Sequence, residues 1–163
     1  MSNFFGLIER LVKADVDFVI VGGFAGVVYG CTYVTQDIDV CCDFSATNLL
    51  RLQQALTDLQ PAHRMTPKRP KLELTEENCS RYKNLYLDTD IGRLDCLSFI
   101  DGVGDYEKVK QNSNLIEVDG MQFRVLNLDA LIETKKAMNR PRDKETVLQL
   151  EAIKKLKKRT YPK

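Results

Sequence analysis

The chain has 163 residues, of which 44% are hydrophobic and 29% charged, a composition typical of one globular domain with its own core. No apolar run reaches the roughly 20 residues that a membrane helix needs, and the N-terminal segment is helical rather than signal-like in character, so we expect a cytoplasmic protein with no membrane partner. Five cysteines without a CxxC pair argue against disulfides and against a structural zinc site.

Charge is unevenly distributed along the chain, although the net charge is only +1. Residues 135–163 hold 11 basic and 3 acidic residues, a net of +8, whereas the remainder holds 13 basic and 20 acidic residues, a net of −7. A basic end on an acidic body suits a polyanion such as RNA. A solvated basic helix face explains the final lysines at least as well.

Apolar periodicity and turn residues divide the first part of the chain into alternating helices and strands. In chain order the pattern predicts a helix over 3–14, a strand over 17–21, a short helix in the small-residue segment 24–30, a strand over 38–42 and a helix over 46–60 that Ser45 caps. Three prolines then indicate a loop of basic residues.

The second part of the chain is richer in strands. The pattern predicts strands over 84–88 and 93–99, a helical turn within 105–111, a hairpin of 115–118 and 121–125 joined by Asp119-Gly120, a helix over 128–139 capped by Asn127, and, after an interruption at Pro141, a last helix over 142–158. This order predicts a mixed α/β fold with a central sheet flanked by helices. We expect a single domain over 1–163, with a core of about 5–126 and a C-terminal helical part of about 127–160.

Gly22 and Gly23 end the first strand but fit neither familiar phosphate-binding pattern. The segment that follows has no lysine for a GxxxxGK[ST] loop, and its glycine spacing differs from GxGxxG. A strand that leads through two glycines into a helix N-terminus still presents free backbone N–H groups to an anion. The alternative is a tight turn in which glycine only relieves steric conflict.

Asp37 and Asp39 are two residues apart on a strand, so their side chains face the same way, opposite to those of Ile38 and Val40. Two like charges side by side repel each other unless a positive group lies between them. Mg²⁺ takes oxygen ligands from carboxylates and from substrate phosphates, and Mn²⁺ is the other candidate cation. A pair exposed on the surface is the simpler alternative for an isolated DxD.

Asp95 is a third acid in an apolar strand, between Leu94 and Cys96. On a neighbouring strand it would complete a two-metal site, in which one cation holds the nucleotide phosphates and the other activates an attacking hydroxyl. The alternative is that Asp95 pairs with a basic neighbour such as Arg93 or Arg81.

A basic cluster marks the junction of the last two predicted helices, with Lys135, Arg140 and Arg142 close to Asp143. These cations are placed to reach a triphosphate. The alternative is charge complementarity at the two helix ends.

The order and spacing of these segments resemble the nucleotidyltransferase fold superfamily, which includes DNA polymerase β and minimal bacterial nucleotidyltransferases. The shared pattern is a helix, an apolar strand, Gly22-Gly23, a thirteen-residue spacer, the DxD of Asp37 and Asp39, and a later Asp95. The nearer likeness is to small bacterial members of the abortive-infection and toxin–antitoxin type, through Lys135 and the turn 140–143. The resemblance covers about residues 5–155.

The resemblance implies a set of roles and partners. Asp37, Asp39 and Asp95 would be the catalytic metal ligands, and the nucleotide-binding residues would be Gly22, Gly23, Thr35, Lys135 and Arg140. The substrate would be an NTP with Mg²⁺, the acceptor RNA or tRNA, a protein or a small hydroxyl compound, and an antitoxin-like protein would be a partner.

Tyr33 departs from the family pattern, because many relatives carry an arginine two residues before the threonine that precedes DxD. Either triphosphate binding is weaker here or another cation substitutes, with the loop 64–71 as a source.

The sequence therefore predicts a Mg²⁺-dependent transfer of an NMP to a hydroxyl, with release of pyrophosphate. The alternative is a module that keeps the fold, has no catalytic activity, and binds nucleotide, RNA or a partner protein. The transferase interpretation requires the three acids to converge beside the two glycines. An arginine buried against Asp95 is the observation we set against it.

Overall fold

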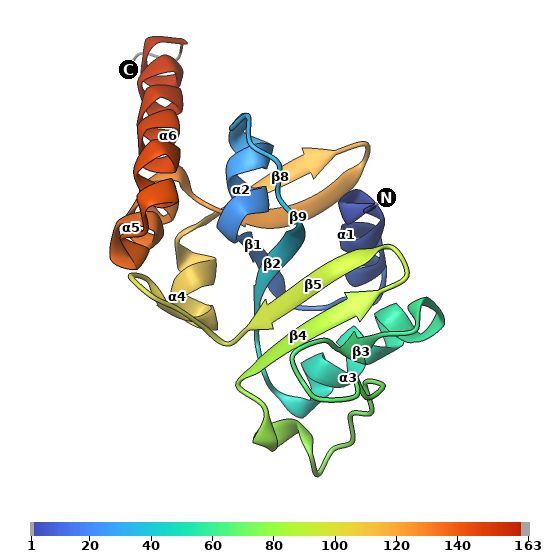
Figure 1. Ribbon diagram of the computed structural model, residues 1–163. Helices are drawn as coiled ribbons and strands as arrows, with labels where there is room; N and C mark the ends of the chain where they lie inside the picture. The colour runs from blue at the N-terminus through green and yellow to red at the C-terminus, as the bar shows by residue number, and fades with distance from the viewer. Residues whose placement is uncertain (1, 161–163) are drawn as a thin grey trace.

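The computed structural model describes residues 2–160, with the backbone alone for 158–160, and shows a mixed seven-stranded sheet between helices (Figure 1). The strand order is β3-β4-β5-β2-β1-β9-β8. The strands of this sheet are β1 Phe18–Val21, β2 Asp37–Cys42, β3 Ala62–His63, β4 Asn84–Thr89, β5 Gly92–Leu97, β8 Ser113–Val118 and β9 Met121–Leu126, and a separate ribbon pairs β6 Phe99–Ile100 with β7 Gly104–Asp105. The helices are α1 Phe4–Lys13, α2 Gly22–Tyr29, α3 Ala46–Leu56, α4 Tyr106–Gln111, α5 Leu128–Met138 and α6 Pro141–Thr160.

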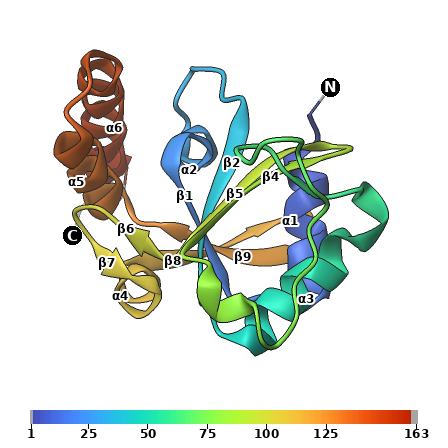
Figure 2. The same cartoon turned by 60° about the horizontal axis from the view of Figure 1, so that its bottom comes forward.

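The helices form two groups on opposite sides of the sheet (Figure 2). Helices α1 and α3 pack against each other on one side, where their apolar faces bury Leu7, Leu11, Leu49 and Leu52. Helix α2 contacts α5 and α6 on the other side, and α4 packs under β1, β2 and β9. This arrangement confirms the predicted class, a mixed α/β fold with a central sheet flanked by helices.

The centre of the sheet consists of β1, β2 and β5, and their pairing decides which side chains meet. Strand β1 is antiparallel to β2 and parallel to β9, while β2 runs parallel to β5. Ile38 and Val40 are fully buried in the core, so the alternate residues of β2 face the other side of the sheet. Within the β2–β5 pair, Asp39 lies directly opposite Asp95.

Helix caps and the predicted hairpin form as the local sequence indicates. Ser45 Oγ accepts a hydrogen bond from the N–H of Asn48 at 3.3 Å, and Asn127 Oδ1 accepts one from the N–H of Ala130 at 2.8 Å. Residues 119 and 120 join β8 to β9 with φ angles of 51° and 78°, the left-handed conformation of a type I′ turn.

Some predicted boundaries were wrong. The helix predicted over 46–60 ends at Leu56 and continues as a 3₁₀ turn, and the loop beyond it contains the short strand β3. The strand predicted over 93–99 ends at Leu97, because the chain there leaves the large sheet for the ribbon of β6 and β7, a change that alternation cannot signal. The break between the last two helices lies where it was predicted, but the last helix begins at Pro141 itself and not at residue 142, since proline suits a first position where its missing N–H has no intrahelical partner. Among residues 2–160, no helix combines the length and apolar character of a membrane span.

Asn48 links α3 to the ends of β1 and β2 by hydrogen bonds, and the residue is only 2% exposed. Its Oδ1 accepts from the N–H of Asp17 at 2.7 Å, and its Nδ2 donates to the carbonyls of Asp17 and Asp43 at 3.0 and 2.7 Å. One side chain therefore satisfies three backbone groups that the strands leave unpaired.

We expect Asn48→Ala to lower the free energy of unfolding by about 2–3 kcal/mol, because buried backbone groups lose their partners. Urea denaturation measures this. Gln54→Ala, on the exposed side of the same helix, serves as control and should change stability by less than about 0.5 kcal/mol. Equal losses in the two variants would contradict the assigned role of Asn48.

Candidate active site

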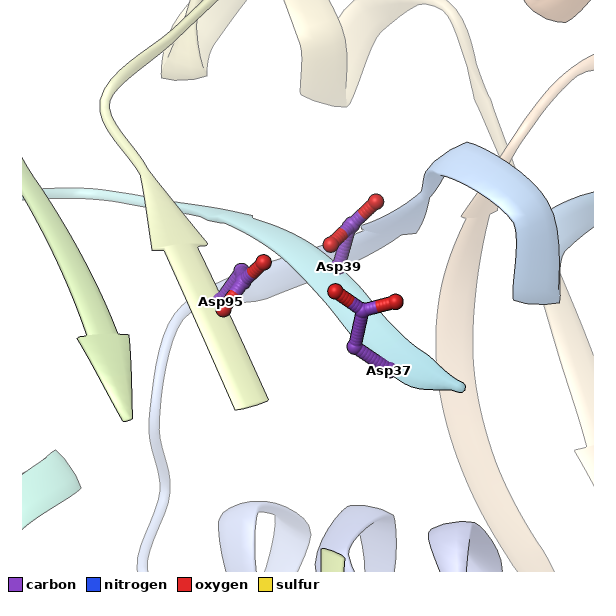
Figure 3. Close-up of side chains that lie close together, drawn as sticks. All are labelled: Asp37, Asp39 and Asp95. Carbon is purple, nitrogen blue, oxygen red and sulfur yellow. The ribbon is translucent and has the colours of Figure 1, made fainter. Parts of the chain in front are cut away.

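Three carboxylates converge at the centre of the sheet. Asp37 and Asp39 extend from the same face of β2, and Asp95 extends toward them from β5 (Figure 3). One oxygen from each side chain lies within 4.8 Å of the others. The parallel pairing of β2 with β5 produces this cluster, because it sets Asp39 beside Asp95 and places Asp37 two residues along the same face.

Burial and mutual repulsion disfavour the ionised forms of Asp37 and Asp39. Burial, followed by the charges of Asp95 and Asp37, raises the pKa of Asp39 to about 7. Burial and the charge of Asp95 also raise the pKa of Asp37, although Arg64 and Arg93 oppose the shift. The protein holds carboxylates closer than their charges favour, and a divalent cation would relieve the repulsion.

Gly22 allows the backbone to approach Asp39 closely. Its φ of +66° lies in the left-handed region, and a Cβ atom at this position would collide with the Asp39 carboxylate. Gly22 is also the first residue of α2, so the free N–H groups of that helix begin beside the carboxylates. Gly22 therefore does more than avoid steric conflict within a turn, because the Asp39 carboxylate occupies the space that a side chain at position 22 would fill.

The segment between α2 and β2 covers the start of α2. Tyr33 donates a hydrogen bond from its hydroxyl to the carbonyl of Gly23 at 2.8 Å, and burial raises its pKa. Thr35 donates from its hydroxyl to the carbonyl of Asp37, also at 2.8 Å, so it fixes the beginning of β2. Tyr33 thus packs as a neutral group at the position where the family pattern has an arginine.

A cavity of about 1100 Å³ opens over the carboxylates and reaches the junction of α5 and α6. Its lining includes every site residue predicted from the sequence: Gly22, Gly23, Thr35, Asp37, Asp39, Asp95, Lys135 and Arg140. A smaller cavity of about 510 Å³, beside α5 and α6, has none of them in its lining.

Asp143 is 2% exposed and forms ion pairs with Lys135 and Arg140, two basic residues in the wall of the large cavity. It accepts hydrogen bonds from the backbone N–H of Arg140 at 3.0 Å and from its Nε at 2.7 Å, and Lys135 Nζ lies 3.8 Å away. Burial lowers the pKa of Lys135, while the charges of Asp143 and Asp39 act to raise it. Charge complementarity at the helix ends, the alternative raised for this cluster, is therefore also present. Asp143 caps the first turn of α6 and at the same time pairs with Lys135 and Arg140.

Arg64 is the residue that the sequence did not identify individually. Its guanidinium forms a two-pronged ion pair with Asp95, with Nη2–Oδ2 at 2.8 Å and a shorter Nη1–Oδ1 contact, and Nη2 also lies 3.5 Å from Asp37. Its side chain is 13% exposed. The pairing of Asp95 with a basic group, foreseen as an alternative, is real, but the partner is neither Arg93 nor Arg81. Arg93 instead lies 3.5 Å from Asp88.

One of the two alternatives drawn from Tyr33 was that the loop 64–71 supplies a cation in place of the missing arginine, and Arg64 does come from this loop. Two of its nitrogens are committed to Asp95, however, so the contact is with a carboxylate of the site. No local pattern marks Arg64, since it follows a two-residue strand in a segment with several other basic residues.

The donor set fits a divalent cation of the magnesium class. Carboxylate oxygens are the ligands that Mg²⁺ and Mn²⁺ prefer, and Asp37 and Asp39 offer them from adjacent positions on one strand face. Burial first, and then the neighbouring carboxylates, raise the pKa values of both groups, so a bound cation would favour their ionised forms.

Comparison with solved structures shows that this chain has the nucleotidyltransferase fold. The lincosamide antibiotic adenylyltransferase LnuA, with lincomycin bound, is 15% identical and aligns over 92% of this chain and 95% of its own, with a TM-score of 0.62. ANT(2″)-Ia in complex with adenylyl-2″-tobramycin is 15% identical over 94% and 91%, with a TM-score of 0.56. A protein of Thermotoga maritima described as a nucleotidyltransferase is 18% identical over 90% and 88%, with a TM-score of 0.55. No protein-family model and no curated protein matches the sequence.

We expect Gly22→Ala to displace the Asp39 carboxylate and to weaken Mg²⁺ binding by at least about tenfold. Gly120→Ala is a matched control, because Gly120 also has a positive φ, +78°, but nothing lies within 4 Å of the added Cβ. The control should lose only about 1 kcal/mol of stability from backbone strain and should keep its Mg²⁺ affinity. Calorimetric titration with Mg²⁺ and urea denaturation measure the two effects; equal behaviour of the variants would refute the close-approach argument.

Mg²⁺ affinity should depend on pH, because the cation must displace a proton from Asp39, whose pKa is raised to about 7. The carboxylate is ionised above this pKa, so the affinity should fall by up to about tenfold per pH unit below it and level off above it. Titrations from about pH 5.5 to about pH 8 check the trend, and Asp39→Asn should weaken it, leaving the smaller dependence that comes from Asp37, whose pKa is also raised. A flat profile in the unmodified protein would show that Asp39 does not bind the cation.

Proposed function

We propose that this protein is a Mg²⁺-dependent nucleotidyltransferase, which transfers an NMP from an NTP to a hydroxyl group and releases pyrophosphate. The observation that carries the proposal is the convergence of Asp37, Asp39 and Asp95 beside Gly22, at the start of a helix and in one cavity. The shared fold supports it, because neighbours of nearly the same length include a lincosamide antibiotic adenylyltransferase and a protein in complex with adenylyl-2″-tobramycin.

The two carboxylates of β2 would hold the cation together with the triphosphate. A divalent cation held there would supply positive charge to the phosphate oxygens and to the leaving pyrophosphate. The N–H groups at the start of α2 would donate to phosphate oxygens from the other side. Lys135, held by Asp143 on the opposite wall, would add a positive charge to the same space.

Asp95 would orient the acceptor. Each carboxylate oxygen has two lone pairs, so the ion pair with Arg64 leaves a further lone pair on each oxygen of Asp95. A hydroxyl that donates to Asp95 would have its oxygen directed toward the α-phosphorus. The new bond joins that oxygen to phosphorus, the bond to the β-phosphate oxygen breaks, and the hydroxyl proton passes to Asp95.

A small hydroxylated compound is the acceptor that we favour. The structural neighbours include a protein with bound lincomycin and a protein in complex with adenylylated tobramycin. The cavity of about 1100 Å³ is large enough for a nucleotide and a second small molecule. RNA remains the second acceptor class, although some of the basic residues of α6 have partners within the chain, such as Lys154 with Asp129 and Lys157 over the ring of Tyr29. A toxin role with an antitoxin-like partner rests on the sequence resemblance alone.

The ion pair of Arg64 with Asp95 favours a second candidate, the binding module without catalytic activity. An arginine against Asp95 was the observation set in advance against the transferase, because it occupies the acid that a second cation would bind. The objection holds for a two-metal mechanism. It does not reach Asp39, and Asp37, which Arg64 Nη2 approaches to 3.5 Å, still shares a face with Asp39 toward the cavity.

The enzyme proposal predicts Mg²⁺-dependent incorporation of label from NTPs carrying ³²P at the α-phosphate, in the presence of a cell extract that supplies acceptors. Asp39→Ala should reduce incorporation by at least about a thousandfold, since it removes a cation ligand. Asp90→Ala, in the exposed turn between β4 and β5, should leave it unchanged. Undiminished incorporation by Asp39→Ala would defeat the mechanism.

The same preparations separate the two candidates. If the unmodified protein binds NTP only with Mg²⁺ and incorporates label, the enzyme is supported. If it binds NTP or RNA equally well without Mg²⁺ and incorporates nothing from any of the four NTPs, the module is correct.

A further inference from the structure

Arg64 is anchored to β4, next to two residues of the cavity lining, Tyr86 and Asp95. Its backbone N–H donates to the carbonyl of Tyr86 on β4 at 3.0 Å, which extends the pairing of β3 with that strand. Its guanidinium carbon lies 5.6 Å from the centre of the Tyr86 ring. Backbone and side chain are thus both anchored to β4, so the charged group cannot leave Asp95 without loss of the ring contact.

The guanidinium of Arg64 contacts two of the carboxylates, in the way that a bound metal cation would. Two nitrogens contact the two oxygens of Asp95, and one of them also lies 3.5 Å from Asp37. A guanidinium has no acceptor atom and stays charged at every accessible pH, so it cannot share these oxygens with a metal as a neutral group would. A divalent cation at Asp95 would lie against this charge in a poorly solvated place, where repulsion is strong.

The charge balance of the cluster agrees with this geometry. Three ionised carboxylates carry −3, and Arg64 reduces the total to −2, which one divalent cation neutralises. Lys135 and Arg140, two cations on the cavity wall, are both engaged by Asp143. A second divalent cation would bring the three carboxylates and Arg64 to a net +2 before any substrate entered.

We infer that Arg64 takes the place of a second divalent cation at Asp95, so that the site binds one divalent cation, between Asp37 and Asp39. The inference rests on the proposed function for the existence of that cation site. Arg64 is then a positioning residue, since it orients Asp95 toward the acceptor by an ion pair, where a two-metal site would use a metal.

The test counts Mn²⁺ bound by the full-length protein, from the electron paramagnetic resonance signal of free Mn²⁺ during titration. The unmodified chain should bind one ion. Arg64→Met, which keeps the length of the side chain and removes its charge, should bind two, and Arg64→Gln should do the same. The double variant Arg64→Met with Asp95→Asn should return to one, because the added site needs the Asp95 carboxylate. Arg69→Met is the matched control in the same loop, with an exposed side chain that pairs with Asp88, and should bind one.

The outcomes separate this inference from the proposed function. Two ions on the unmodified chain, or one ion on both Arg64 variants with circular dichroism showing them folded, would overturn the role of Arg64 and leave the transferase proposal standing. No ion on the unmodified chain would overturn both. Because the count on the unmodified chain is itself decisive, the inference stays falsifiable even if the Arg64 variants fail to fold.

Discussion

The repulsion among three carboxylates is the constraint on which the site depends. Parallel pairing of β2 with β5 forces Asp39 and Asp95 side by side, and the alternation of β2 adds Asp37. The fold tolerates this because Ile38 and Val40 bury the opposite face of the same strand. The burial of these apolar side chains therefore offsets the repulsion among the carboxylates on the other face, which does not itself stabilise the fold.

Two groups of ion pairs lie on either side of this charge. Arg64 reduces the charge of the cluster from the β3 side, and Asp143 holds Lys135 and Arg140 on the opposite wall. One arrangement places a cation among acids, and the other places a buried acid among cations. Within the three-carboxylate cluster, Asp95 has the closest contact with Arg64, so we assign the divalent cation to Asp37 and Asp39.

Sequence reasoning reached the shared face of Asp37 and Asp39, the helix caps and the hairpin turn through local rules, whereas the overall fold and the convergence of Asp95 came from the family resemblance. Alternation in β2 predicts that Asp37 and Asp39 share a face, and the helix caps and the Asp119-Gly120 turn depend on neighbouring residues alone. Arg64 was beyond its reach, because its contact with Asp95 spans 31 positions and depends on the pairing of β3 with β4. The collision that Gly22 avoids is likewise invisible in sequence, since it depends on where β2 places Asp39.

The most direct test of the account is the anomalous scattering of crystals grown with Mn²⁺ and a non-hydrolysable NTP analogue. The account predicts an anomalous peak between the carboxylates of Asp37 and Asp39, next to the triphosphate, with Arg64 still in contact with Asp95. Triphosphate and Mn²⁺ bound away from Asp37 and Asp39 would contradict its central claim, that the crowded carboxylates of β2 hold a catalytic cation.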